Sequence, residues 1–370
     1  LLERSNLFVT PLDQERGWYR YHRLFADLLR FTLRKKMPEK IPLLQRRASG
    51  WFEDNGFVVE AIDYAAAAGD FQRAARLLEE HAQHFLKRGE IALLLRRLDA
   101  LPEHVIVERP SLCIYHAGTR LLAGRPLAEV EGRLADAGEE GAVSAVALVF
   151  KSLIALLLGD VGRSLDLSGQ AQDSLAASRV EDSAYWRSTV FSSRGMAFVM
   201  TGDVEAAINA FEASARIGRE AGNKMAVVGS LANLAGLTLA RGQLHKSADS
   251  YRRALDLATD ARGNRLPVAH RVLLGLGELA REWNDLRAAE GYFAESLELS
   301  QRYGETGPMN LMGLMSLLHL ARVKAAQGEI ETADAMFTEA RQMALISEVT
   351  PLDDFLVGLA HARHALEQGD

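Results

Sequence analysis

The stretch "MTGDVEAAINAFEASARI", Met200–Ile217, decides the fold, because its pattern returns three more times downstream. Each copy has Gly or Asn, then an acidic or polar residue, then a helical pattern with a small residue and, four residues later, an aromatic one. The further copies are Ala240–Leu257, Glu282–Leu299 and Ala326–Met343, and weaker ones begin at Ala67, Leu122 and Leu157. Self-similarity at this period predicts a stacked array of helical units.

The turn residues of the copies give the period of the array. Gly159, Gly202, Gly242, Asn284, Gly328 and Gly369 are 43, 40, 42, 44 and 41 residues apart. Gly or Asn permits the left-handed conformation that ends a helix. In the helix that follows, a small residue and an aromatic share one face. The small residues are Ala207, Ser247, Ala289 and Ala333, and the aromatics are Phe211, Tyr251, Phe293 and Phe337. We therefore predict an all-α fold, a right-handed superhelix (solenoid) of antiparallel helix pairs with a period of about 40–44 residues.

This pattern resembles the tetratricopeptide repeat. The small residue that this repeat has in its first helix is matched by Gly195, Ala235, Gly277 and Ala321. The period is longer than the usual length of about 34 residues, which implies longer helices. Proline favours the first position of a helix, so prolines upstream of the turns predict where first helices begin; these are Pro267, Pro308 and Pro351.

Composition narrows the class of protein. The chain has 370 residues and a net charge of −6, which argues against nucleic-acid binding through bulk electrostatics. Its one cysteine, Cys113, excludes an internal disulfide. Ala142–Gly159 is apolar but carries Lys151 at its centre, so we predict a buried helix and no membrane span. The chain opens on Leu1 without a signal peptide, and we expect a cytoplasmic piece of a larger protein.

The N-terminal stretch has a different character. Asn6–Arg30, "NLFVTPLDQERGWYRYHRLFADLLR", predicts two short strands around a polar turn at Asp13–Gly17, followed by a helix over Arg23–Lys36. The basic run Arg30–Lys36 is open to a DNA or membrane contact. Basic residues in a last helical turn also interact favourably with the helix dipole, and we favour this interpretation.

Asn6–Arg30 resembles the wing hairpin and following helix of the large ATP-dependent LuxR-type transcriptional activators, the MalT-like members of the STAND class. Ala48–Glu80 and Leu86–Arg125 are similar to the helical stretch that continues in that family, and the later repeats to its superhelical sensor. The resemblance covers the whole chain and is most specific in the first 125 residues. It implies a winged-helix remnant over residues 1–37, degenerate helical repeats or a linker over 38–140, and a tetratricopeptide-like sensor domain over 141–370.

The resemblance also implies a function. A MalT-like sensor domain binds a small-molecule inducer and passes the signal to an ATPase domain and a LuxR-type DNA-binding domain. The sequence holds no G-x-x-x-x-G-K-[ST], so we expect no cofactor in this fragment, while ATP is implied for the NTPase domain of the whole protein. The resemblance further implies self-association of the full-length protein, and no direct DNA contact by this fragment.

Chemistry-bearing motifs are scarce. Gly275–Ala280 matches the G-x-G-x-x-A pattern of dinucleotide-binding sites. Such a site needs a strand before the pattern and a helix that begins at it, whereas this stretch lies inside a predicted helix. Two histidine pairs, His81 with His84 and His361 with His364, could each share a helix face. A zinc site would need further ligands that are not evident, so we interpret them as surface histidines. We expect no catalytic residues, no metal site and no enzymatic activity in the fragment.

Candidate ligand-binding residues come from the inward-facing positions of the first helices, counted back from each turn. Their polar side chains suit an oxygen-rich or anionic small ligand, and arginines suit carboxylate or phosphate. Two aromatics at one end are candidates for a stacking wall. The residues are Tyr185, Trp186, Ser192, Ser193, Asn233, Arg271, Glu278, His319, Arg322 and Arg363. Solvated residues of a broad groove remain an alternative for each of them.

Two functions therefore stay open from the sequence. One is a small-molecule sensor, for which we expect a closed pocket with aromatic lining. The other is a protein-interaction scaffold, in which an open groove with extended charge binds a peptide or a regulatory protein. Neither function involves a membrane.

Overall fold

A computed structural model describes residues 9–11, 19–123, 125–138, 141–177, 182–260, 263–303, 308–346 and 358. The chain forms two compact units, Leu1–His81 with Ala100–Val105, and Ala82–Asp99 with Ile106–Asp370. The predicted domain boundaries at residues 37 and 140 differ from this division and stay predictions. Several predicted features lie outside the described residues, namely the Asp13–Gly17 turn, Gly369, Pro351, His361 and His364.

The first unit begins with the predicted hairpin. Strand β1 (Val9–Pro11) pairs antiparallel with β2 (Tyr19–Tyr21), with Val9 opposite Tyr21. Helix α1 (Arg23–Lys36) has the predicted bounds, and basic residues occupy its last turn as expected. The unit continues with η1 (Pro38–Lys40), α2 (Ile41–Asp54) and α3 (Val58–Ala67). Helix α4 (Phe71–Arg88) and the short α6 (Glu103–Val107) contribute residues to both units.

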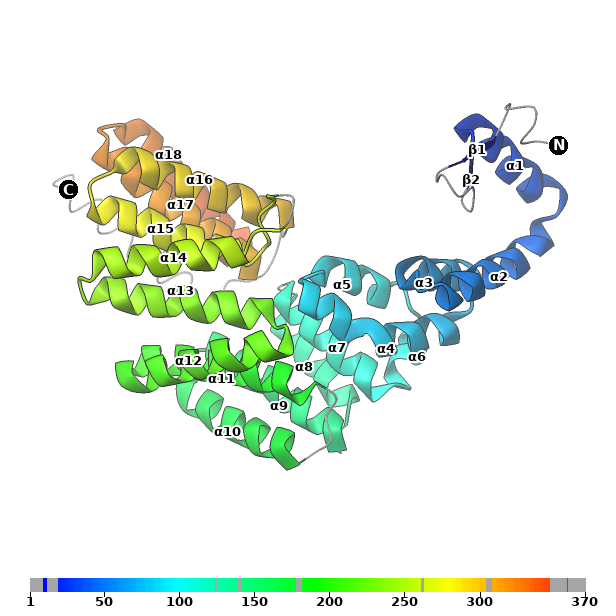
Figure 1. The fold of residues 1–370 in the computed structure, drawn as a ribbon, viewed down its shortest axis with the longest axis horizontal. Helices are drawn as coiled ribbons and strands as arrows, with labels where there is room; N and C mark the ends of the chain where they lie inside the picture. The colour runs from blue at the N-terminus through cyan, green and yellow to red at the C-terminus, as the bar shows by residue number, and fades with distance from the viewer. Residues whose placement is uncertain are drawn as a thin grey trace. The chain divides into compact units, whose positions relative to one another are not determined.

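The second unit is the helical array (Figure 1). It begins with α5 (Ile91–Asp99), α7 (Pro110–Leu122) and α8 (Leu127–Asp136). Five helix pairs follow, α9 (Gly141–Leu157) with α10 (Val161–Ala177), α11 (Ser183–Thr201) with α12 (Val204–Ala221), α13 (Lys224–Ala240) with α14 (Leu244–Leu257), α15 (Ala269–Glu282) with α16 (Leu286–Tyr303), and α17 (Pro308–Ala326) with α18 (Ile330–Ile346). The all-α solenoid-like fold is confirmed. The apolar stretch around Lys151 is helix α9, and among the described residues no helix is long and apolar enough to cross a membrane.

The turn within each pair follows from the sequence pattern. The described turn residues Gly159, Gly202, Gly242, Asn284 and Gly328 all have positive φ, between 58° and 84°. The acidic residue that follows caps the second helix in several copies. The Asp203 carboxylate accepts a hydrogen bond from the Ala206 N–H, and Asp285 accepts one from Ala288, both at 3.0 Å. A side-chain acceptor here satisfies an N–H that has no partner inside the helix.

In two of the pairs, α11–α12 and α15–α16, an aromatic of the second helix lies on a glycine of the first. Phe211 packs on Gly195 and Phe293 on Gly277, so closely that a methyl group at either glycine would overlap the ring. The small residues of the second helices, Ala207, Ser247, Ala289 and Ala333, are fully buried. Where that residue is serine, its hydroxyl also donates to a carbonyl of the first helix, as Ser247 does to Ala235 at 2.8 Å.

Successive pairs meet through a second repeated contact. Ser214 of α12 accepts a hydrogen bond from Ser230 of α13 at 2.9 Å, and Ser296 of α16 accepts one from Ser316 of α17 at the same distance. All four serines are buried, so each hydroxyl is satisfied inside the array. The first helices of successive pairs, α9, α11, α13, α15 and α17, also contact one another. They consequently form one continuous surface of the second unit.

Candidate ligand-binding pocket

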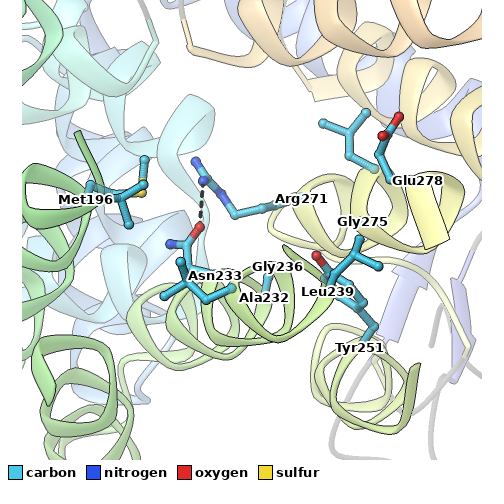
Figure 2. Close-up of a pocket in the computed structure, with 12 residues that line it drawn as sticks. Met196, Ala232, Asn233, Gly236, Leu239, Tyr251, Arg271, Gly275 and Glu278 are labelled. Atoms are coloured by element: carbon cyan, nitrogen blue, oxygen red, sulfur yellow. Dashed lines mark hydrogen bonds between the residues drawn. The ribbon is translucent and has the colours of Figure 1, made fainter. Parts of the chain in front are cut away.

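A cavity of about 420 Å³ opens on the surface formed by α11, α13 and α15 (Figure 2). This volume lies within the range of ~300–1,000 Å³ that small-molecule sites occupy. The lining residues are mainly apolar, with a few polar groups among them. They are Met196, Val199, Ala232, Asn233, Gly236, Leu237, Leu239, Tyr251, Arg271, Leu274, Gly275 and Glu278.

Tyr251 reaches the cavity because glycines leave room for its ring. The side chain comes from α14, behind the surface of first helices, and is almost fully buried. A methyl group at Gly275 would overlap the ring, and one at Gly236 would lie 3.3 Å from the hydroxyl. Burial raises the pKa of Tyr251 to about 12, with the nearby Glu278 carboxylate adding to the shift and Arg271 opposing it. The phenol therefore stays protonated and presents a neutral hydroxyl.

Arg271 is the cation of the pocket. Its Nη1 donates to Asn233 Oδ1 at 3.3 Å, which joins α15 to α13 across the opening (Figure 2). Both side chains are half-buried. Burial lowers the pKa of Arg271, since a low-dielectric environment disfavours the charged form, and Tyr251 partly offsets the shift. Arg271 nevertheless stays charged, because a guanidinium does not lose its proton in proteins.

Glu278 is the anion of the pocket, and its charge is compensated. Arg281 Nη1 donates to Glu278 Oε1 at 2.8 Å, and His319 Nδ1 of α17 lies 2.7 Å from the same oxygen. Burial alone would raise the pKa of Glu278, but these two partners outweigh it and hold the pKa at about 2. The His319 ring in turn stacks on Phe293, with centroids 4.9 Å apart and planes 11° from parallel. Glu278 is therefore fixed to the neighbouring repeat.

The structure brings together some of the predicted site residues. Asn233, Arg271 and Glu278 line the cavity, and His319 contacts Glu278. Arg322 and Ser192 are half-buried on α17 and α11, outside the lining. Arg363 lies outside the described residues.

Three other candidates are buried away from the cavity. Ser193 is 3% exposed, and its hydroxyl donates to the Val190 carbonyl at 2.9 Å. Tyr185 and Trp186 are 6% and 3% exposed and pack edge-to-face, with Trp186 also against Phe150. The expected stacking wall is therefore not part of this pocket. The physical reason is that the start of α11 faces the α9 and α10 helices, where large aromatics fill the core.

Sequence reasoning missed Tyr251 and Met196 as lining residues, since it assigned Tyr251 to the core alone. A signal was present in the sequence. Gly236 and Gly275 lie inside helices, where glycine is unfavourable by about 1 kcal/mol relative to alanine, and such a residue often marks a close approach. Among the described residues no cluster of His, Cys, Asp and Glu has the geometry of a metal site.

Comparison with known proteins gives the family. Residues 145–370 match the model of the MalT-like TPR region, and residues 1–41 match that of the MalT winged helix domain. The chain is 26% identical over 327 residues to the HTH-type transcriptional regulator MalT of Klebsiella pneumoniae, covering 87% of this chain and 36% of that protein. It is 35% identical over 124 residues to the serine/threonine-protein kinase PknK of Mycobacterium tuberculosis, covering 34% of this chain and 11% of that protein. The chain thus spans only a minor part of each relative.

Solved structures agree on the fold. A STAND protein with a tetratricopeptide repeat sensor from Pyrococcus horikoshii superposes with a TM-score of 0.57 at 15% identity, covering 95% of this chain and 56% of that one. NprR in complex with its cognate peptide NprX superposes with a TM-score of 0.55 at 15% identity, covering 84% of each chain. The family match spans more than half of the chain and includes every helix that lines the cavity, so the chain belongs to the family of proteins with a MalT-like TPR region.

Proposed function

We propose that this chain is the effector-sensing part of a MalT-like, LuxR-type transcriptional activator, and that its effector is a small molecule bound in the cavity between α11, α13, α14 and α15. The observation that carries the proposal is the cavity itself, in which an apolar wall surrounds Asn233, Arg271, Glu278 and the Tyr251 hydroxyl. Apolar walls with a few convergent polar groups are typical of small-molecule sites.

The position of the cavity suggests how binding becomes a signal. Its lining comes from three consecutive repeats, so a ligand that contacts α11, α13 and α15 favours one spacing of these repeats over others. Repeat arrays hold together mainly through contacts between neighbours, and a change at one interface alters the geometry of the array. In the proposed mechanism, the array passes this change to the ATPase and DNA-binding domains of the whole regulator, where ATP binding and self-association occur. This part of the protein has no catalytic role in the mechanism.

The test is a thermal-shift screen of the chain against sugars, organic acids and aromatic acids. A true effector stabilises the protein saturably, because it binds the folded state alone. Met196→Trp places a bulky side chain in the cavity and should abolish the shift. Met200→Trp is the matched control, since Met200 is 44% exposed on the same helix, outside the lining, and should retain the shift.

A second candidate function is binding of a peptide or a regulatory protein by the surface of first helices. Its support is the fold shared with NprR, which was solved in complex with its cognate peptide. A screen that finds no stabilising small molecule, together with a peptide or protein partner whose binding survives Met196→Trp, would overturn the sensor proposal and favour this one.

A further inference from the structure

The charge balance of the pocket indicates what kind of effector it takes. Arg271 has several N–H donors, and among the described residues the one acceptor they meet is Asn233 Oδ1 at 3.3 Å, beyond the usual N–H···O distance of about 3 Å. In the part of the chain that the structure describes, no ion pair compensates the guanidinium. The other N–H groups of Arg271 are therefore available to a ligand.

The other charge of the pocket does not neutralise Arg271. Glu278 already interacts with Arg281 and His319. It lies seven residues along α15 from Arg271, about 10 Å at the rise of an α-helix. Figure 2 shows the two side chains at opposite sides of the opening, with the guanidinium near Asn233 and the carboxylate directed away from it.

The surroundings of Arg271 are apolar. The larger apolar side chains of the wall are Met196 and Val199 of α11, Leu237 and Leu239 of α13, and Leu274 of α15. A half-buried cation in such surroundings is poorly solvated, and an anion placed against it would restore favourable electrostatics. The fork of N–H groups on a guanidinium matches the two oxygens of a carboxylate.

We propose that the pocket takes a monocarboxylate with an apolar chain or ring, an assignment that rests on the proposed function and names its ligand class. The ligand carboxylate binds the guanidinium of Arg271 and the side-chain amide of Asn233. Its apolar body lies against the methionine, valine and leucine wall. One guanidinium compensates one negative charge, and Arg271 is the only cationic residue among the described residues that line the cavity. A dicarboxylate or a doubly charged phosphate therefore fits less well than a monocarboxylate.

The test is isothermal titration calorimetry with four kinds of probe. They are the monocarboxylates from butanoate to decanoate with phenylacetate, the neutral 1-octanol, the dicarboxylate suberate, and a neutral trisaccharide. At least one monocarboxylate should bind saturably, and more tightly than octanol and suberate. Arg271→Gln should weaken that binding by roughly 10- to 100-fold, the effect of losing a charge-assisted hydrogen bond.

Control variants separate this effect from misfolding. Arg252→Gln makes the same change on the exposed side of α14, where Arg252 pairs with the exposed Asp249, and should leave binding unchanged. Arg271→Lys keeps the positive charge but loses the forked N–H donors of the guanidinium. This variant should bind the monocarboxylate with an affinity between those of wild type and Arg271→Gln. If Arg271→Gln does not fold, Arg271→Lys supplies the comparison.

The outcomes distinguish this inference from the proposed function. Binding of the trisaccharide or octanol but of no monocarboxylate, abolished by Met196→Trp, would overturn the ligand class and leave the sensor function in place. Equal affinity of a monocarboxylate for wild type, Arg271→Gln and Arg271→Lys would also overturn it. Failure of every probe would overturn the ligand class alone, because the wider thermal-shift screen decides the sensor function.

Discussion

Gly277→Ala tests whether the close packing inside a repeat holds the array together. A methyl carbon at this position would stand 2.6 Å from Cζ and 2.7 Å from Cδ1 of Phe293, well inside the van der Waals distance. The ring has little room to retreat, because Phe293 is fully buried and stacks on His319. Phe293 or the α15–α16 spacing must therefore shift.

The size of the effect follows from two opposing contributions. Overpacking of a core position costs typically about 1–3 kcal/mol. Replacing glycine by alanine inside a helix gains about 1 kcal/mol. With the ring buried and stacked we expect an overpacking cost in the upper part of this range, about 2–3 kcal/mol, for a net loss of about 1–2 kcal/mol. In a unit of this size such a loss lowers Tm by about 2–8 °C.

Gly291→Ala is the matched control, since Gly291 lies in the adjacent helix α16 with nothing within 4 Å of an added methyl group. It should raise stability by about 0.5–1 kcal/mol through helix propensity alone. The assay is differential scanning calorimetry of both variants, with Phe293→Leu added to each. In the Gly277→Ala background the smaller leucine should relieve the overlap, so the double variant should lose less stability than the sum of the two single losses. In the Gly291→Ala background the two effects should simply add. If both alanine variants raise Tm equally, the packing argument is wrong.

Two other predictions concern polar groups. Glu278 has a folded-state pKa of about 2, below the ordinary value of 4.5, so its ion pairs contribute stability that is present above about pH 5 and lost as pH falls toward pH 2. Glu278→Gln should therefore flatten the fall of Tm over this acid range. Glu282→Gln, at an exposed site on the same helix, is the control and should follow wild type. Parallel curves of Tm against pH for wild type and both variants would refute the lowered pKa of Glu278. Asn223 is 2% exposed; its amide donates to Ser188 Oγ at 2.9 Å and its carbonyl oxygen caps α13 through the Ala226 N–H at 3.1 Å. Asn223→Asp keeps the cap but removes the donor and buries a charge, so urea unfolding should show a loss of about 2 kcal/mol or more, and a loss below about 0.5 kcal/mol would contradict this network.

The repeat architecture was predictable because the information is local. Each turn needs a residue that tolerates positive φ, and an aromatic in the second helix needs a small residue opposite it, so both constraints recur in the sequence with the period of the fold. The bounds of α1 and the N-terminal hairpin followed in the same way from a change in hydrophobic pattern.

The candidate site was predictable only in part. Counting from the turn residues placed Asn233, Arg271 and Glu278 on one surface, since helices of similar length keep their register from repeat to repeat. The same counting could not tell that Tyr185 and Trp186 fill the core at the start of α11, because their environment depends on helices from a preceding repeat. Nor could it place Tyr251 at the cavity, since that depends on glycines in two other helices.

The sequence by itself determined the helices, their turns, their pairing and the family, because all of these depend on residues that are neighbours within one repeat. Only the tertiary structure decided which charges are compensated. Glu278 contacts His319, which lies 41 residues further along the sequence, and Arg271 contacts Asn233, 38 residues before it. The charge compensation of the pocket therefore depends on how adjacent repeats are spaced. That spacing leaves Arg271 facing an apolar cavity with a weak amide contact, and it is the physical basis for the proposed ligand site.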